Sequence, residues 1–445
     1  MPLPPQAEPS RYRWLVPAVL VTAAALLFFF RLSTPQRYVY DEVYHGYTAS
    51  QYVEGNADAW LWSTKAPRAP APAQAVAYEW THPPLGKLLM AVGIWVAGPG
   101  AVGWRLASAA FGTLGVGLVY VLALQLTRRR LAAALAAGLL LVDGLYFVQA
   151  RTGMVDIFLT IFLVAALLFF YRYLTAPPDR VRWPLLLTGG MMGLALATKW
   201  SAVYACVLIG LVTLVRAYNL RKQARSRRPK SDVVMGYREH LRWIPMGLIG
   251  LPLLLYLATY IPFFLEGHTP AQLVELHRQM YYYHTHLKAT HSYASRWWSW
   301  PLTLRPVWYF VGRANGETAS IYANGNPVLY WAFLPAMAVA IRLWWRQHTA
   351  ALLVLLIGFF GQWLPWSLSP RISFIYHFLP VVPFGCLAVG LVLAHLWRRG
   401  NGGRALVGGY LLLVVAAFAW LYPIYSAVYL RPSALSARFL LDSWR

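Results

Sequence analysis

Long apolar segments are the feature of this sequence that most restricts how the chain can fold. A helix needs roughly 17 to 25 apolar residues to cross about 30 Å of hydrocarbon, and segments such as 104–126 and 374–396 reach that length. The 445 residues are 59% apolar and 12% charged, which is the composition of a chain surrounded mainly by lipid. The sequence therefore predicts an all-α integral membrane protein, with one transmembrane domain over 1–445 and no separate soluble domain.

About eleven segments are predicted to cross the membrane as helices. They are 14–31, 104–126, 131–148, 154–172, 184–197, 200–216, 243–264, 328–344, 349–366, 374–396 and 405–427. A further apolar stretch, 85–97, is short for a crossing and can equally lie along the membrane surface.

Basic residues decide between these two placements. If 85–97 does not cross, the clusters at 128–130, 172–182 and 216–242 all share the side of the N-terminus. The positive-inside rule assigns that side to the cytoplasm. The odd number of spans then puts the C-terminus outside. Two large loops, 32–103 and 265–327, lie outside as well. The first of these loops is predicted to contain amphipathic helices that lie along the membrane interface.

The formal net charge of +24 does not indicate a nucleic-acid-binding protein. The Lys and Arg residues cluster at the ends of apolar segments, where topology signals beside anionic lipid are expected. The basic 216–242 loop is interpreted in the same way, in preference to a specific ligand site. Cys206 and Cys386 both lie in apolar segments, so no disulfide framework is predicted.

Two carboxylates follow the first span, Asp41 and Glu42, in the aromatic stretch YVYDEVYHGY. Ionisable residues at the ends of spans are costly, at roughly 2.5 to 3.5 kcal/mol each at mid-membrane, and are therefore often functional. The predicted topology puts several basic residues on the same outer side: His82, Lys87, Arg105, Arg151, Lys199 and Arg371. Acids among cations at a lipid surface suit a site that holds a lipid phosphate while a base acts beside it. The alternative for the acids, an incidental place on an interfacial helix, stays open.

Three further features have structural alternatives. Asp143 and Asp156 flank Arg151 and can be partners that make this arginine tolerable near lipid; we favour that role for Asp143 and leave both roles open for Asp156. The second outer loop holds His277, His284, His286 and His291. No metal site is predicted there, because no Cys or carboxylate cluster adjoins these histidines.

An ordered set of motifs resembles the protein O-mannosyltransferase family, membrane enzymes of the GT-C class. The strongest part is Asp41–Glu42 followed by HPPLGKLL at 82–89. Others are WRLASAAFGTLGV at 104–116, LVDGLYFVQARTGMVDIFL at 141–159, ATKWSAVY at 197–204, HSYASRWWSWPLTLRPVWYF at 291–310, NGNPVLYW at 324–331 and SPRISFIYHFLPVVPF at 369–384. The resemblance covers nearly the whole chain and implies a GT-C bundle.

The sequence departs from that family in two places. Eukaryotic members often have Asp two residues before the HPP histidine, whereas this chain has Trp80 there and Glu79 one residue earlier. Whether an acid contributes at this point stays open. The 265–327 loop is too short for the soluble lumenal domain of the eukaryotic enzymes, so the chain looks like a compact, prokaryotic-type member.

The resemblance implies an inverting mannosyltransferase of the cell membrane. Its donor would be polyprenyl-phosphate-mannose, and its acceptors the Ser or Thr hydroxyls of translocated proteins. Asp41 would be the general base and Glu42 would position the acceptor, while Asp156 would contribute to substrate binding. The phosphate would be met by Arg105, Arg151, Lys199 and Arg371, with His82, Lys87, Tyr376 and His377 nearby. No cofactor would be required, although a divalent metal could share the phosphate charge.

Two rival functions are distinguishable by experiment. A GT-C enzyme can instead pass its sugar to a lipid or cell-wall glycan, which product analysis would reveal. A transporter of lipid-linked sugar would show an internal repeat with paired, Gly-interrupted helices, and we find neither in the sequence.

Overall fold

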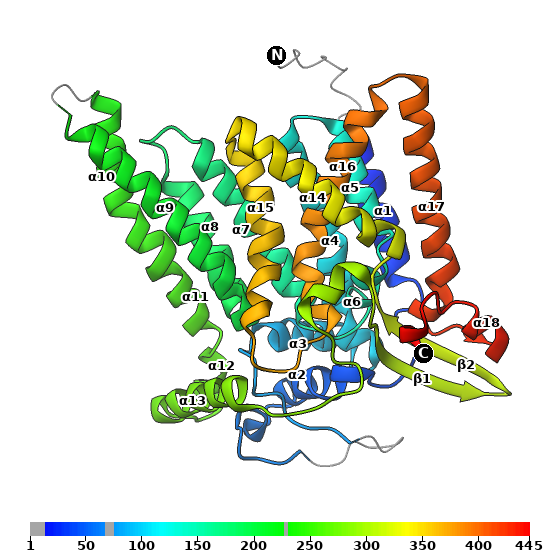
Figure 1. Ribbon diagram of the computed structural model, residues 1–445. Coiled ribbons are helices and arrows are strands. Elements are labelled where there is room, and N and C mark those ends of the chain that lie inside the picture. The colour runs from blue at the N-terminus through cyan, green and yellow to red at the C-terminus, as the bar shows by residue number, and fades with distance from the viewer. Residues whose placement is uncertain (1–13, 67–74, 227–229) are drawn as a thin grey trace.

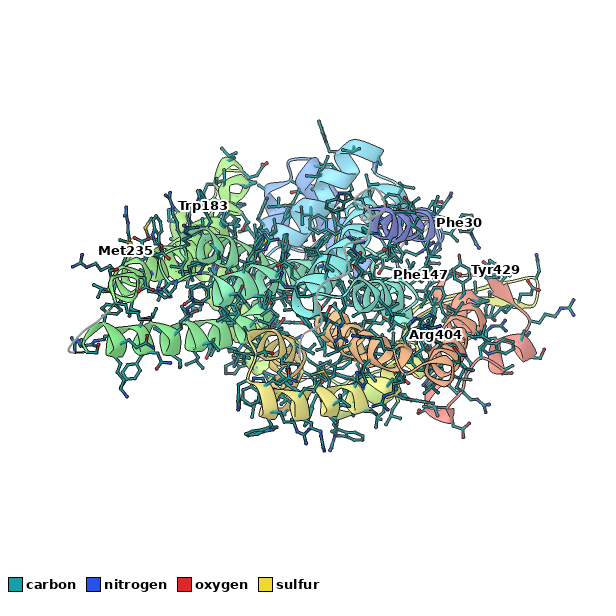
Figure 2. The ribbon with its side chains drawn as sticks, turned by 90° about the horizontal axis from the view of Figure 1, so that it is seen from above. Phe30, Phe147, Trp183, Met235, Arg404 and Tyr429 are labelled. Carbon is teal, nitrogen blue, oxygen red and sulfur yellow. The ribbon has the colours of Figure 1, made fainter. Side chains whose placement is uncertain are left out.

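The computed structural model describes residues 14–66, 75–226 and 230–445. The fold is a bundle of roughly parallel helices with a smaller layer of short elements at one end (Figure 1). Seen along the helices, the bundle has an elongated cross-section, with Trp183 and Met235 toward one edge and Arg404 toward the other (Figure 2). Large apolar side chains such as Leu254 and Leu413 are exposed on its sides, as expected of a surface that contacts lipid.

Eight helical segments of the described residues are long and apolar enough to cross a membrane. They are α4 (Ala101–Thr127), α7 (Asp156–Thr175), η4 with α9 (Trp200–Ala224), α10 through α11 (Ser231–Ala258), α14 (Pro327–Gln347), α15 with η7 (Ala350–Leu368), η8 with α16 (Ile375–Trp397) and α17 (Asn401–Tyr425).

Three shorter helices account for the other predicted spans: α1 (Leu15–Phe29), α5 (Arg130–Leu141) and α8 (Arg182–Leu196). They pack against the longer helices, α1 and α5 on α4 and α8 on α7. Each of the eleven predicted spans therefore corresponds to helical chain, but the count of eleven crossings is not confirmed by length. The predicted span 131–148 breaks near Val142, and a short helix α6 (Gly144–Gln149) follows, capped by the Asp143 carboxylate, which accepts from the Tyr146 N–H at 2.8 Å.

The predicted basic loop 216–242 is mostly helical, which corrects its description as a loop. Helix α9 continues to Ala224 and α10 begins at Ser231; residues 227–229 lie outside the described residues. Arg and Lys are good helix formers, and their long side chains can reach the interface from a helix that extends past the apolar region.

Helix α3 (Leu85–Ala97) runs along one end of the bundle, the end that carries the short elements, and does not cross the bundle (Figure 1). Its first N–H donates to the Ala197 carbonyl after α8, at 3.0 Å, and its end is joined by a short turn to the start of α4. The end of α8 and the start of α4 lie at the same end of the bundle (Figure 1). Both ends of α3 are therefore at one side, as the surface interpretation predicts.

The remaining short elements lie at this same end. They include η2 (Tyr40–Val43), α2 (His45–Val53), η3 (Ala57–Trp60), α12 (Ile261–Leu265), α13 (Pro270–His286), η6 (Trp297–Leu302) and, after the last span, α18 (Pro432–Ser436) and η9 (Asp442–Trp444). Helix α13 begins with a capping box, in which Thr269 and Gln272 satisfy each other's N–H groups.

A small antiparallel sheet was not predicted. Strands β1 (Val307–Ala314) and β2 (Glu317–Ala323) form a hairpin, and β3 (Tyr429–Leu430) pairs with β2. The hairpin turns at Asn315 and Gly316, both with positive φ, as a two-residue Asn-Gly turn requires. The all-α expectation thus holds for the bundle but not for this hairpin.

Candidate active site

Asp41 lies on η2, directly after the first helix, at the end of the bundle that carries α2, α3 and α13 (Figure 1). Its side chain is half-buried. No side-chain hydrogen bond or ion pair engages its carboxylate among the contacts of the described residues. Lys199, Asp156, Glu79 and Arg371 are close enough to act on it electrostatically. Asp41 is therefore an acid with unused hydrogen-bonding capacity in a charged setting.

Glu42, the neighbour of Asp41, is fully buried and fully engaged. Its oxygens accept from the Nε and Nη2 of Arg105 at 2.7 and 2.8 Å, and from the backbone N–H groups of Val39 (2.9 Å) and Gly153 (2.7 Å). The carboxylate thus joins η2 to α4 and to the turn before α7. We assign Glu42 a positioning role, since it has no free oxygen to offer an acceptor.

Arg105 and Arg151 are anchors of the same kind. Besides binding Glu42, Arg105 donates to the carbonyls of Leu32, Pro35 and Arg37. Arg151 donates to the Leu27 and Arg31 carbonyls at 3.0 Å and to that of Phe30, at the C-terminal end of α1, where helix carbonyls lack intrahelical partners. Both guanidinium groups donate to backbone carbonyls of the segment 27–37, which leads from α1 to η2 and Asp41. Neither arginine lines the cavity described below.

A second buried acid is Glu79, whose contribution the sequence left open. The Lys87 ammonium donates to the Glu79 carboxylate at 2.5 Å and to the His82 carbonyl at 2.9 Å. The Glu79 carboxylate also accepts from Thr81 and from the His82 N–H. This network fixes the HPP turn at the start of α3, and Lys87 is used within it.

Asp156 and Lys199 form an ion pair, and both groups are close enough to Asp41 to act on its carboxylate electrostatically. The Lys199 ammonium donates to Asp156 at 2.8 Å, and both side chains are buried. The same ammonium lies 5.6 Å from the centre of the Tyr376 ring. Lys199 also lines the cavity described below. Its ammonium therefore pairs with Asp156 and can also contact a ligand in that cavity.

Arg371 is bound through His284 to the HPP turn. Its Nη1 donates to the His284 Nδ1, and the His284 Nε2–H donates to the Thr81 carbonyl at 2.7 Å. The ring of His284 stacks on that of His82 at 5.2 Å. Arg371 Nε is buried, and no described residue accepts a hydrogen bond from it. Arg371 is therefore held at one nitrogen and free at another.

His377 presents a neutral donor to the same region. Its Nδ1 accepts from the Phe374 N–H at 3.1 Å, which assigns the ring proton to Nε2 in the neutral tautomer. The ring stacks on Trp366 at 4.2 Å and lies beside Tyr376.

A cavity of about 470 Å³ reaches from the HPP turn to η7 and η8, and Asp41 is not among the residues that line it. His82, Lys199, His284, Arg371 and His377 line it together with Trp200, Tyr204 and Trp366. A second hollow, of about 390 Å³, adjoins it and shares Trp366, Ser369 and Arg371. The cavity thus gathers cations and neutral donors and has aromatic walls.

Burial shapes the protonation of the acid and the histidines. Loss of water around Asp41 raises its pKa to about 7, although Lys199 opposes this shift. Burial lowers the pKa of His45 and of His284 to about 4, and it also lowers the pKa of His82 well below its usual value. Burial acts to raise the pKa of Glu79, but Lys87 outweighs it and the pKa is lowered. Near neutral pH, Asp41 is the group of this set that titrates.

The structure brings part of the predicted set to the cavity and places the rest behind it. His82, Lys199, Arg371 and His377 line the cavity, and Tyr376 and Asp156 support Lys199. Glu42, Lys87, Arg105 and Arg151 hold the backbone. Sequence reasoning left the contribution of Glu79 open. It missed Trp366 and the role of His284, which it weighed only as a metal ligand. Among the described residues, no group of three His, Cys, Asp or Glu side chains is arranged to hold a metal ion.

Comparisons with known proteins agree with this architecture. The family model described as dolichyl-phosphate-mannose-protein mannosyltransferase matches residues 18–266, and that of the C-terminal four-helix transmembrane region of protein-O-mannosyltransferase matches 269–444. The polyprenol-phosphate-mannose–protein mannosyltransferase of Mycobacterium tuberculosis is 32% identical over 439 residues, covering 82% of this chain and 81% of that protein. Its namesake from Corynebacterium glutamicum is 27% identical over 430 residues, with 82% and 81% covered.

Two solved structures share the fold. The Saccharomyces cerevisiae protein O-mannosyltransferase Pmt1–Pmt2 complex bound to the sugar donor superposes with a TM-score of 0.79 at 17% identity, covering 97% of this chain and 92% of that chain. ArnT from Cupriavidus metallidurans bound to undecaprenyl phosphate gives a TM-score of 0.61 at 20% identity, with 93% and 65% covered.

Proposed function

This chain belongs to the dolichyl-phosphate-mannose-protein mannosyltransferase family, and from that premise we propose that it moves mannose from polyprenyl-phosphate-mannose to Ser or Thr hydroxyls of proteins. The observation that carries the proposal is the Asp41 carboxylate, which has no hydrogen-bond partner among the described residues and lies within electrostatic reach of Lys199 and Arg371, two cations that line the cavity with His377. An acid that can accept a proton and cations that can receive a phosphate are the two requirements of this transfer.

Asp41 is the general base of the proposed mechanism. It takes the proton of the acceptor hydroxyl as that oxygen attacks the anomeric carbon, while the bond from this carbon to the phosphate oxygen breaks. The products are the mannosylated hydroxyl, with inverted configuration, and polyprenyl phosphate. A pKa raised to about 7 suits the task, because a base works best when its pKa lies near the working pH.

The leaving phosphate is met by protein groups. Arg371 offers its free Nε, His377 its Nε2–H and Lys199 its ammonium. Aligned donors that await developing charge lower the barrier more than mobile water does. These groups supply the needed charge themselves, so the proposal includes no cofactor and no metal ion.

Replacing Arg371 tests the donor side of the site. Arg371→Ala should raise the KM for the lipid donor at least about tenfold, whereas Arg371→Lys should raise it less, because a lone ammonium still attracts phosphate but lacks the planar fork. Arg296→Ala, at an exposed arginine of the adjoining hollow, is the control and should stay within about twofold of wild type. Equal donor KM values in all of these proteins would remove Arg371 from the phosphate site.

The pH dependence of transfer should follow Asp41. Only the deprotonated carboxylate is a base, so kcat/KM should fall about tenfold per pH unit below pH 7 and level off above it. The pKa values of His45 and His284, near 4, are too low to produce this limb. Initial rates between pH 5.5 and 8.5 at peptide concentrations well below KM would measure it, and a flat profile across that interval would contradict the assignment.

The proposed location is the plasma membrane, with the N-terminus in the cytoplasm and the site outside. The basic clusters near residues 129, 182, 225, 346 and 398 lie at the bundle end opposite η2 and α13 (Figure 1), and the positive-inside rule supports a cytoplasmic assignment for that end.

Cysteine labelling tests this orientation. In a background with Cys206 and Cys386 replaced by Ala, a cysteine introduced at Ser292 should react with a membrane-impermeant maleimide on intact cells. A cysteine at Ser226 should react only after the membrane is broken. Both serines are exposed, so accessibility within the fold is matched. The reverse pattern would invert the proposed orientation.

Product analysis separates this function from sugar transfer to a lipid or glycan. Purified protein would be incubated with radiolabelled polyprenyl-phosphate-mannose and either a Ser- and Thr-containing peptide or a lipid-linked glycan. Label in the peptide alone is the expected outcome. Label in the glycan alone would show that the acceptor is a glycan and would contradict the proposed protein acceptor.

A further inference from the structure

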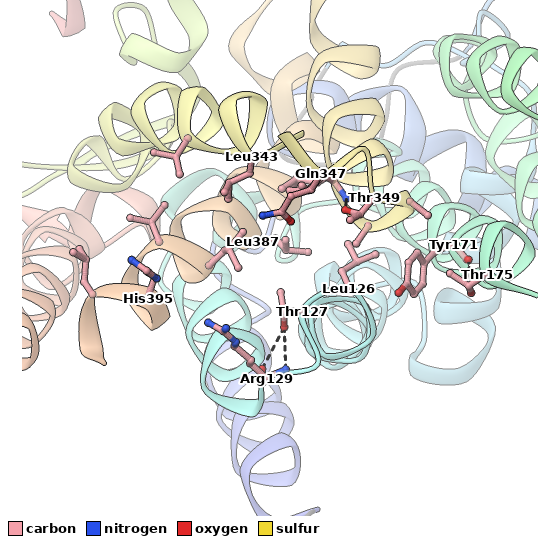
Figure 3. A pocket seen from close by; sticks show the side chains of 18 of the residues that line it. Leu126, Thr127, Arg129, Tyr171, Thr175, Leu343, Gln347, Thr349, Leu387 and His395 are labelled. Carbon is pink, nitrogen blue, oxygen red and sulfur yellow. Dashed lines mark hydrogen bonds between the residues drawn. The ribbon is translucent and has the colours of Figure 1, made fainter. Parts of the chain in front are cut away.

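A hollow in the described part of the chain lies far from the site. It has a volume of about 850 Å³ and is enclosed by the ends of α4, α7, α14, α15 and α16 (Figure 3). On α7, the site end begins at Asp156 and the hollow is reached at Tyr171 and Thr175. At 1.5 Å per residue, these ends are about 28 Å apart, so the hollow belongs to the opposite face of the membrane.

The interior of the hollow is apolar over a depth that matches one lipid leaflet. Its lining on α16 runs from Leu387 to Leu396, which is about 13 to 14 Å along a helix. Leu126 and Leu343 contribute further apolar surface from α4 and α14 (Figure 3). Half of a hydrocarbon core of about 30 Å is about 15 Å. An acyl chain of one leaflet therefore has the length that this lining offers.

The rim of the hollow is polar and basic. Arg129 and Arg399 line it, both exposed at the membrane-surface level, and the Arg399 Nη2 lies 3.3 Å from the His395 Nε2. Gln347 and Thr349 add neutral polar groups from the turn between α14 and α15 (Figure 3). None of the described lining residues is Asp or Glu. The rim is thus complementary to a negative headgroup.

We propose that this hollow is a binding site for an anionic glycerophospholipid, distinct from the donor site. One acyl chain fills the apolar interior, and the phosphate diester lies between Arg129 and Arg399. A zwitterionic lipid would bring a quaternary ammonium toward the same arginines, and free phosphate would leave the apolar lining empty. Basic pockets between transmembrane helices are a recognised means of binding such headgroups.

Native mass spectrometry of the detergent-purified full chain tests the proposal with phosphatidylglycerol, phosphatidylcholine and inorganic phosphate as probes. Arg129→Ala/Arg399→Ala removes the rim charges, and Leu391→Trp fills the interior, since Leu391 is a partly exposed lining residue. The matched control is Arg346→Ala/Arg398→Ala, which removes two exposed arginines from the same end but outside the lining. Thermal unfolding without added lipid checks that each variant is folded.

Wild type and the control pair should bind phosphatidylglycerol with equal affinity, and phosphatidylcholine and phosphate much more weakly. The rim pair should bind phosphatidylglycerol at least about tenfold more weakly, because each arginine near a lipid headgroup contributes substantially. Leu391→Trp should lower binding similarly. Equal losses in the rim and control pairs would show attraction to overall charge and overturn the proposal. Wild-type binding by Leu391→Trp would also overturn it, and this variant decides the matter if the rim pair does not fold.

Discussion

Replacing Asp41 with asparagine is expected to lower the rate of mannosyl transfer by at least about 100-fold, since general base catalysis contributes about 10²- to 10⁴-fold. Asparagine has the size of aspartate but cannot accept the hydroxyl proton. Because the Asp41 carboxylate holds no other residue in place, folding and donor affinity should stay as in wild type. Single-turnover transfer with bound donor measures the chemical step directly.

Asp58→Asn is the matched control for this change. Asp58 lies in the same loop between α1 and α3, on η3, and is exposed, so its substitution should leave the rate within about twofold. Transfer by Asp41→Asn within threefold of wild type, at unchanged donor affinity, would end the assignment of Asp41 as the base. Glu42 would not replace it, because its oxygens are occupied by Arg105 and two backbone N–H groups.

Arg105→Ala is expected to cost about 3 to 5 kcal/mol of unfolding free energy, since it leaves a buried charge without its partner. The charge is Glu42, which is 0% exposed and pairs with Arg105 at 2.7 Å. The Leu32, Pro35 and Arg37 carbonyls lose their donor as well. Unfolding titrations in mixed detergent micelles would measure the loss.

Two comparisons separate the buried pair from a general loss of charge. Arg278→Ala breaks an exposed ion pair with Glu275, of 3.6 Å, and should cost about 0 to 1 kcal/mol. Adding Glu42→Gln to Arg105→Ala should recover part of the stability, because the buried charge is then gone. A loss under 1 kcal/mol for Arg105→Ala, or no recovery in the double variant, would contradict the anchoring role.

Features with a local cause were predictable from the sequence. The apolar segments predicted where the bundle helices lie, and the distribution of basic clusters predicted that the short segment 85–97, helix α3, does not cross. The hairpin had a local signal that we did not use: Asn315-Gly316 between two runs rich in β-formers is a strong indicator of a two-residue turn. Residues 307–310 of its first strand served as the end of the segment 291–310 that resembles the family.

The sequence did not predict which charged residues line the cavity and which hold the backbone, because this depends on contacts between residues that are distant in sequence. Glu42 and Arg105 are 63 residues apart in sequence, and His284 and Thr81 are 203 apart. A single sequence shows that acids and cations share one side of the membrane, but not which of them satisfy each other. Arg105 and Arg151 look like Arg371 in sequence, and only the fold shows that their donors are used on backbone carbonyls.

In the proposed mechanism, Asp41 and the nearby cations of the cavity transfer mannose from a lipid phosphate to a protein hydroxyl. The most direct test is the mass of a single-Ser acceptor peptide after incubation with polyprenyl-phosphate-mannose and vesicles that contain the purified protein. We expect a gain of one hexose on the serine with wild type, at least about 100-fold slower modification with Asp41→Asn, and no gain with a peptide that carries Ala at that position. An unmodified Ser peptide from wild-type vesicles that consume the donor, or full modification by Asp41→Asn in the same time, would contradict this mechanism.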